Sequence, residues 1–120
     1  MNANEQMVGV DSMDFSNYQW RTGHTAIYPM DKALEYLSLG LVSEAGEVAG
    51  KVKKIIRDHG SELTPELIEA LEFELGDVLW YIAQLCTILK TNLGVVANKN
   101  VEKLALRKQA NTIKGSGDDR

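Results

Sequence analysis

Cysteine, proline and aromatic residues are all scarce in this sequence. Cys86 is the single cysteine of the 120-residue chain, so an internal disulfide and a cysteine-rich zinc site are both excluded. Only two prolines, Pro29 and Pro65, and 7% aromatic residues are present. Helix breakers are therefore few, and the alternation typical of strands is rare. This composition favours an all-α protein.

An excess of positive charge and a long hydrophobic run are lacking as well. The 13 lysines and arginines stand against 17 aspartates and glutamates, for a net charge of −4, whereas coating a nucleic acid requires an excess of base. The longest apolar stretch, Leu71–Leu89, is interrupted by acids such as Glu72 and Asp77, which makes it a poor membrane span. Met1–Val10 has neither the basic nor the apolar part of a secretory signal. We therefore expect a soluble, cytoplasmic protein whose partners are neither a nucleic-acid polymer nor a membrane.

Hydrophobic residues make up 44% of the chain, enough for one domain around a single core. They recur at steps of three and four residues, which predicts a four-helix bundle. The first expected helix is short, starts near Asp14 or Ser16 and covers Tyr18–Arg21; the second follows Pro29, with Asp31 as a possible cap, and ends near Arg57. The third runs from Pro65, with Thr64 as N-cap, to about Lys90. The fourth runs from about Val95 to Gln109. We expect residues 1–13 to form an N-terminal extension, 14–113 the folded domain, and 114–120 a flexible glycine-rich tail.

A short acidic segment occurs twice, as Leu41–Val48 and as Leu71–Val78. On helices that advance about 100° per residue, the first acid of each copy falls in the middle of an apolar stripe and the second acid falls on its shoulder. The acids are Glu44 and Glu47 in the first copy and Glu74 and Asp77 in the second. Two antiparallel helices would bring all four carboxylates together.

A charge in the middle of an apolar stripe costs several kcal/mol unless something compensates it. No histidine or arginine lies on these stripes, and the nearest cation, Lys51, cannot offset four carboxylates. A hard divalent cation such as Mg²⁺ or Mn²⁺ can, because it prefers oxygen ligands and leaves positions open for substrate phosphates. The repeat therefore predicts a metal site.

The second and third helices also predict a homo-oligomer, either a dimer or a tetramer. Gly40, Gly46 and Gly50 would each cost about 1 kcal/mol inside a helix relative to alanine, which indicates close approach by a neighbour. The third helix is apolar nearly all round, including Phe73 and Trp80, and needs more cover than one four-helix chain provides.

The acidic repeat, read with its surroundings, resembles the signature of the MazG-type all-α nucleoside triphosphate pyrophosphohydrolases. The matching segments are Ser43-Glu44-Ala45-Gly46-Glu47 and Glu74-Leu75-Gly76-Asp77, and the following Val78–Tyr81 run is similar too. The resemblance extends from Thr25 to the tail, as in compact bacterial and phage members. Ser43 stands where the longer signature has its first acid, which leaves open an outer metal contact or a second cation.

This resemblance implies Mg²⁺-dependent hydrolysis of a (d)NTP to the (d)NMP and pyrophosphate, with nucleotide-pool cleansing or remodelling as the role. It places the metal, Mg²⁺ or Mn²⁺, on Glu44, Glu47, Glu74 and Asp77. Either Glu44 or Glu47 would accept the proton of the attacking water. In the family a lysine and an arginine at the positions of Lys103 and Arg107 hold the pyrophosphate.

Further candidate contacts to the substrate lie on the third and fourth helices. Lys99, Lys103 and Arg107 recur at four-residue steps and form one basic ridge suited to phosphates. Tyr81 follows Asp77 by one turn and is a further candidate for contact with the ligand.

Two other classes of function are alternatives for a helical protein with paired acids. A carboxylate-bridged di-metal redox protein would need Glu-x-x-His pairs, but His24 and His59 lie in predicted loops away from the acids. A non-enzymatic helical interaction module would use the acids only as solvated charge, and would gain no stability from a divalent cation.

Overall fold

The computed structural model describes residues 13–117, and within them it is helical with no strand. The helices are α2 (Phe15–Thr22), α3 (Ala33–His59), α4 (Pro65–Ile88) and α5 (Leu93–Gln109), with two short 3-10 turns, η1 (Gly23–Thr25) and η2 (Met30–Lys32). The all-α prediction is confirmed for this part of the chain. Most of the predicted N-terminal extension and the last three residues of the predicted tail lie outside the described residues.

Side-chain caps start α2 and α4 as the sequence predicts. Asp14 accepts a hydrogen bond from the backbone N–H of Asn17 at 2.7 Å, and Thr64 accepts one from that of Leu67 at 3.2 Å. Both caps satisfy amide groups that the first turn of a helix leaves without a partner. Pro65 stands in the first turn of α4, where its missing N–H costs nothing.

The predicted ends of α3 need correction. Asp31 does not cap this helix, because it lies inside η2, and α3 begins at Ala33 with no side-chain cap on Lys32. At the other end α3 passes the predicted stop at Arg57 and continues to His59. It ends where Gly60 adopts a left-handed φ of 58°, a conformation that glycine adopts at little cost.

The predicted break between the last two helices is present, but it is shorter than expected. α5 begins at Leu93 rather than Val95, because the Asn92 side chain accepts the N–H of Val95 at 2.9 Å and caps the helix. The chain turns by 102° between α4 and α5. Among the described residues no single helix is long and apolar enough to cross a membrane, and only this bent pair meets that test of length and composition together.

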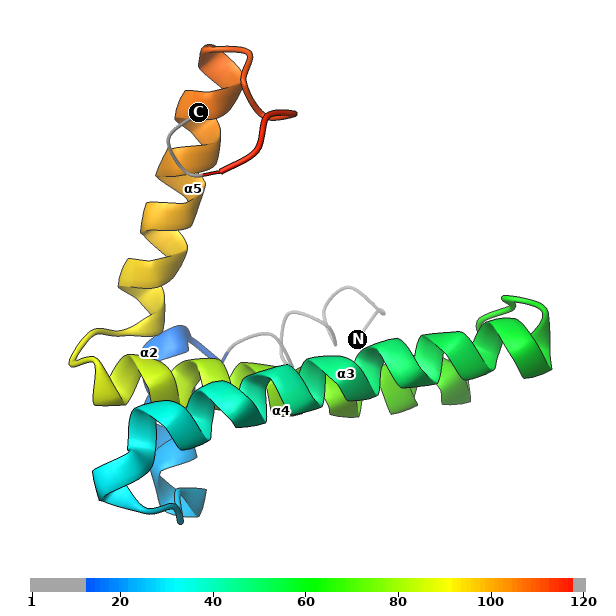
Figure 1. The fold of residues 1–120 in the computed structure, drawn as a ribbon, viewed down its shortest axis with the longest axis horizontal. Helices are drawn as coiled ribbons and strands as arrows, with labels where there is room; N and C mark the ends of the chain where they lie inside the picture. Colours follow the sequence, from blue (N-terminus) through cyan, green and yellow to red (C-terminus); the bar gives the residue numbers. More distant parts are fainter. Residues whose placement is uncertain (1–12, 118–120) are drawn as a thin grey trace, which may run out of the picture.

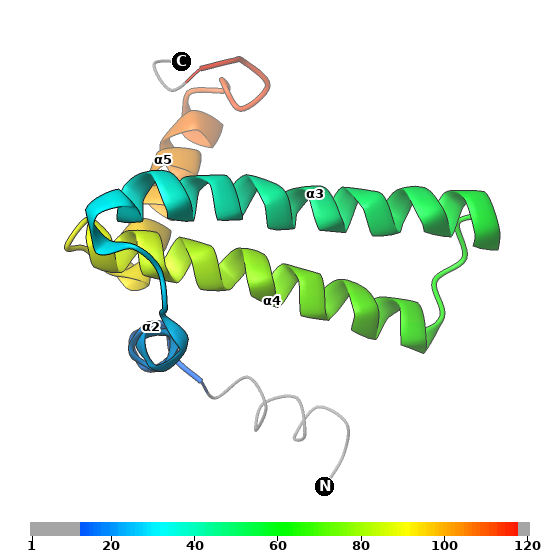
Figure 2. The same cartoon turned by 60° about the horizontal axis from the view of Figure 1, so that its bottom comes forward.

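The two long helices form an antiparallel hairpin from which α5 projects (Figures 1 and 2). α2 packs against α4 and the start of α5 near the base of that projection. The core there consists of Ala83, Cys86 and Leu93, with Tyr18 and Ile82 packed against it. This buried cluster therefore lies at the junction of α2, α4 and α5, and the hairpin extends away from it.

Buried polar groups fix this junction. Gln84, with only 2% of its surface exposed, accepts the Tyr28 hydroxyl at 2.7 Å and donates to Thr22 Oγ1 at 2.7 Å. Gln19 on α2 accepts the backbone N–H of Leu93 at 2.9 Å. Because buried polar groups are costly when unpaired, these bonds specify one arrangement of α2 and α5 on α4.

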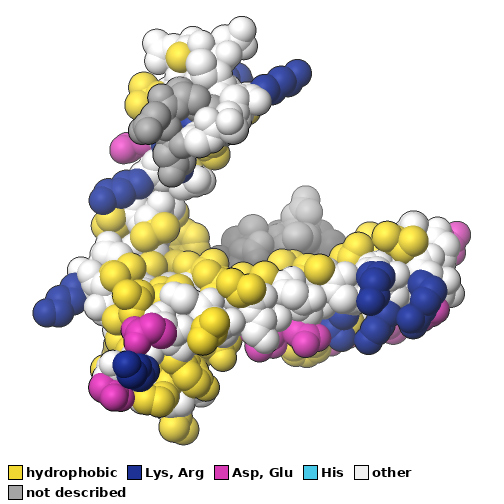
Figure 3. Space-filling view, viewed as in Figure 1, with side chains coloured by type: hydrophobic (Ala, Val, Ile, Leu, Met, Phe, Trp, Pro, Cys, Tyr) yellow, Lys and Arg dark blue, Asp and Glu magenta, His cyan; other side chains and the backbone are white. Residues whose placement is uncertain are grey.

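Much apolar surface of the hairpin is uncovered in this single chain (Figure 3). Leu39 and Val42 on α3 are 72% and 71% exposed, and Phe73 on α4 is 70% exposed. The glycines of α3 differ in their surroundings within this single chain. Gly40 lies directly against a neighbour, but a Cβ at Gly46 or Gly50 would meet nothing within 4 Å among the described residues.

Candidate metal centre

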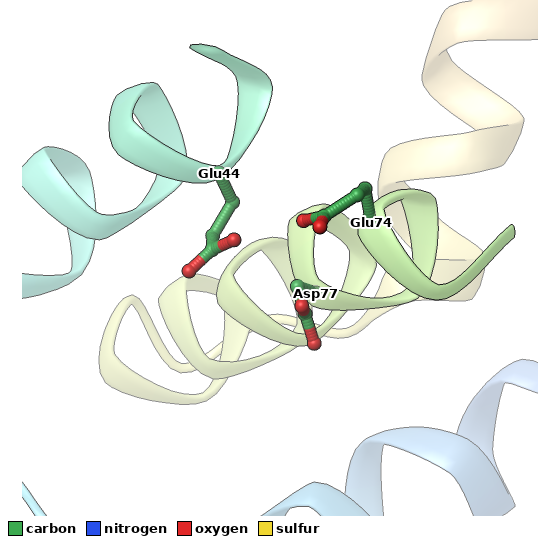
Figure 4. A group of neighbouring side chains, drawn as sticks. All are labelled: Glu44, Glu74 and Asp77. Carbon is green, nitrogen blue, oxygen red and sulfur yellow. The ribbon is translucent and has the colours of Figure 1, made fainter. Parts of the chain in front are cut away.

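Three carboxylates meet between the two long helices. Glu44 comes from α3, while Glu74 and Asp77 come from successive turns of α4 (Figure 4). Each offers one oxygen, and these three oxygens lie within 4.8 Å of one another. Glu44 and Glu74 are half-buried and Asp77 is exposed, so the group opens to solvent on one side.

Close approach of the helices sets this geometry. The Tyr81 ring lies so near Gly40 that a Cβ on Gly40 would overlap it. Glu44 follows Gly40 by one turn of α3, and Asp77 precedes Tyr81 by one turn of α4. The helices run antiparallel, so one turn forward from Gly40 on α3 and one turn back from Tyr81 on α4 reach the same level of the hairpin. Glu44 and Asp77 therefore lie near each other.

Electrostatics in the group are unfavourable without a cation. Burial raises the pKa of the Glu44 carboxyl, and the charges of Asp77, Glu74 and Glu47 raise it further. Burial likewise raises the pKa of the Tyr18 hydroxyl, with a smaller contribution from Asp77. Mutual repulsion of this kind is relieved by a divalent cation that takes oxygen ligands. The donor set therefore fits a hard metal such as Mg²⁺ or Mn²⁺.

One side chain of opposite sign reaches the group. The Nζ atom of Lys51 on α3 lies 3.5 Å from Oε1 of Glu74, and their side chains are 38% and 17% exposed. A single ammonium balances at most one of the three carboxylates. Lys51 is thus close to the acids, as its position one turn after Glu47 predicts.

A pocket of about 310 Å³ adjoins the carboxylates. It is lined by Thr25, Glu44, Asp77, Trp80 and Tyr81. The indole N–H of Trp80 donates to Thr25 Oγ1 at 2.8 Å, and the Trp80 and Tyr81 rings meet edge to face with their centroids 5.0 Å apart. The acids therefore border a cavity with aromatic walls.

The predicted site residues on the long helices are not all brought together. Glu47 is exposed and does not belong to the group of three oxygens within 4.8 Å, although its charge acts on Glu44. Tyr81, in contrast, lines the pocket as its spacing from Asp77 suggests.

The basic ridge of α5 lies apart from the acids of the same chain. Lys99, Lys103 and Arg107 line a separate cavity at the far part of α5, and α5 points away from the hairpin (Figure 1). Arg107 is only 6% exposed. Its Nη2 donates to the backbone oxygen of Gly117 at 3.2 Å, so it packs under the tail.

Thr25 and Trp80 were not singled out as site residues by the sequence. Trp80 has a usable signal, because it lies three positions after Asp77 and shares that side of the helix. No pattern in the sequence marks Thr25 as a site residue, because its position beside α4 depends on the path of the chain through η1.

The histidines take no part in the acidic group. His24 packs edge to face on Trp20 with ring centroids 4.6 Å apart, and His59 is the last residue of α3. Among the described residues, the group of candidate ligands contains only carboxylates, which does not suit the di-metal redox alternative.

Comparison with known proteins agrees with the geometry. The family model described as the MazG nucleotide pyrophosphohydrolase domain matches residues 32–111, a segment that contains α3, α4 and α5. The Gene 37 protein of Mycobacterium phage L5 is 47% identical over 109 residues, which cover 86% of this chain and 96% of the phage protein. No solved structure matches the chain. With its acidic group inside the matched segment, the chain belongs to the family of MazG nucleotide pyrophosphohydrolase domains.

Proposed function

We propose that this protein hydrolyses a (d)NTP to the (d)NMP and pyrophosphate with Mg²⁺ as its metal, Mn²⁺ being a possible substitute. Its role would be nucleotide-pool cleansing or remodelling in the cytoplasm. The observation that supports this most directly is the convergence of Glu44, Glu74 and Asp77 beside a pocket. A triphosphate needs a cation to bind beside these carboxylates, because the phosphates and the carboxylates are both negatively charged.

The proposed metal ligands are these three carboxylates together with Glu47, which lies one turn from Glu44 on α3. A bound divalent cation supplies charge neutralisation to the phosphates and makes water a stronger nucleophile. The protein contributes the positions of its oxygens, which two packed helices hold in place before the substrate arrives.

Glu44 is the better placed of the two candidate proton acceptors. It lines the pocket, whereas Glu47 is exposed and outside it. In the proposed step a water oxygen bonds to the α-phosphorus, the bond from that phosphorus to the bridging oxygen breaks, and Glu44 takes the water proton. Pyrophosphate leaves with the bridging oxygen.

The nucleoside would occupy the pocket beside the acids. The Trp80 and Tyr81 rings offer apolar surface to a base or sugar. Burial raises the pKa of the Tyr81 hydroxyl, and the neighbouring Tyr36, Glu44 and Asp77 raise it further. The hydroxyl therefore stays protonated and is a hydrogen-bond donor to the ligand.

A second copy of the chain would complete the site. The cations proposed for the phosphates, Lys99, Lys103 and Arg107, lie on a helix that turns by 102° away from α4. The hairpin exposes apolar side chains such as Phe73 and Val42, and a face of that kind is usually covered in an assembly. In a dimer or tetramer, α5 of one copy would lie over the acids of another.

The direct test is pyrophosphate release from a panel of canonical and modified dNTPs, with and without Mg²⁺ or Mn²⁺. We expect one pyrophosphate per nucleoside monophosphate, only when the metal is present. Glu44→Gln should abolish release, and Glu69→Gln, which changes an exposed acid of α4 outside the acidic group, should leave it unchanged. Orthophosphate as the only product, or no product with any nucleotide, would overturn the proposal.

A further inference from the structure

Lys51 extends from α3 to one acid of the group on the other long helix. It lies two turns after Glu44 on α3 and therefore on nearly the same side of that helix. From there its Nζ reaches across to Glu74 on α4, 3.5 Å from Oε1. The other two acids of the group have no ion pair of this length among the described residues.

This ion pair and a metal compete for the same carboxylate. An ammonium is a point charge that a neighbouring divalent cation repels. When Glu74 serves as a metal ligand, this repulsion favours movement of the Lys51 head group toward a different anion. Its side chain is 38% exposed and has a flexible four-carbon stem, so the movement needs no change in the backbone.

We infer that Lys51 is a phosphate-binding residue that holds Glu74 in the absence of substrate and turns to the β- and γ-phosphates when the metal and nucleotide bind. This inference rests on the proposed function. The phosphates of a metal-bound triphosphate lie within reach of an ammonium that starts 3.5 Å from a metal ligand. Lys51 also supplies its charge from the same chain, whereas the cations of α5 line a separate cavity on a helix that projects away from the hairpin.

The test compares Lys51→Met and Lys51→Gln with Lys51→Arg, and uses Lys53→Met on the exposed side of α3 as the matched control. Two probes are used, Mn²⁺ alone and inorganic pyrophosphate with saturating Mg²⁺, each measured by calorimetry. Circular dichroism checks that each variant is folded. Neither probe requires turnover or knowledge of the preferred base.

Removal of the Lys51 charge should change the two affinities in opposite directions. Mn²⁺ should bind several-fold more tightly to Lys51→Met and Lys51→Gln, because a competing cation is gone. Pyrophosphate should bind roughly tenfold more weakly, because a charge-assisted hydrogen bond is lost. Lys51→Arg should restore most of the pyrophosphate affinity, and Lys53→Met should match the natural chain with both probes.

Two results would overturn the inference and leave the proposed function standing. One is pyrophosphate binding unchanged in Lys51→Met and Lys51→Gln while the natural chain binds it. The other is weaker Mn²⁺ binding in those variants, which would mean that Lys51 only orients Glu74. If the natural chain bound neither probe and released no pyrophosphate from nucleotides, the proposed function and the inference would both be wrong.

Discussion

The Tyr81 ring of α4 lies against the backbone of α3 at Gly40, at a place where no other residue type fits without movement. Trp80 packs against this ring edge to face, with the ring centroids 5.0 Å apart. This contact stands one turn from Glu44 and Asp77. It therefore sets the helix spacing at the acidic group.

Gly40→Ala should destabilise the protein and weaken metal binding together. Overpacking of this kind costs about 1–3 kcal/mol, while the gain in helix propensity from alanine returns only about 1 kcal/mol. Urea unfolding and Mn²⁺ titration measure the two effects. Gly46→Ala is the matched control, because its Cβ would meet nothing within 4 Å, and it should unfold at the same or a higher urea concentration. Equal stability of the two variants would contradict the role given to the Gly40 contact.

Asp77→Asn should remove the stabilisation that a divalent cation gives. A ligand that binds only the folded state at about 100 times its dissociation constant adds about 2.7 kcal/mol. We expect the melting temperature of the natural chain to rise with Mn²⁺, and that of Asp77→Asn to stay constant. In EDTA the variant should melt at the same or a higher temperature, because it relieves repulsion on Glu44. A natural chain that is indifferent to metal would instead favour a non-enzymatic interaction module.

The raised pKa of Glu44 predicts how metal-free stability depends on pH. Between the ordinary value of 4.5 and the raised pKa in the folded state, the folded chain binds more protons at this group than the unfolded chain does. Stability therefore falls as pH rises through that window, and it recovers on acidification. Glu44→Gln should remove this part of the pH dependence. Melting temperatures in EDTA across that range, compared between the two chains, measure it.

Glu47→Gln provides the graded control for the pH experiment. Among the causes that raise the pKa of Glu44, the charge of Glu47 makes the smallest contribution. The variant should therefore keep most of the pH dependence that Glu44→Gln loses. If Glu47→Gln lost as much of the pH dependence as Glu44→Gln, the charge of Glu47, rather than burial and the other two acids, would be its main origin.

The sequence predicts the parts of this molecule that depend on local chemistry. Asp14 and Thr64 cap the helices they were expected to cap, because a capping side chain acts on amides only a few residues away. Glu44 and Glu74 point inward because helical periodicity alone determines their side of the helix. Asp31 is the exception, since the 3-10 turn η2 begins before α3.

Other features depend on tertiary geometry that a linear pattern does not contain. Glu47 and Asp77 are equivalent in the repeat, yet only Asp77 joins the acidic group. The bend between α4 and α5 is visible in the sequence as a break, but its angle of 102° follows from tertiary contacts such as the Gln19 bond to Leu93. This angle separates the basic ridge from the acids of its own chain.

Complementation between two inactive variants tests whether a second copy supplies the cations. Asp77→Asn removes a proposed metal ligand, and Lys103→Met removes a proposed phosphate contact on α5. If α5 acts on the neighbouring copy, a mixed dimer has one site with both defects and one site with neither. Co-expression of the two variants should then recover about a quarter of the natural pyrophosphate release, because about half of the dimers are mixed. Sedimentation should show an assembly larger than the 13.3 kDa chain. A monomer, or no recovery in mixed assemblies, would mean that each chain must complete its own site.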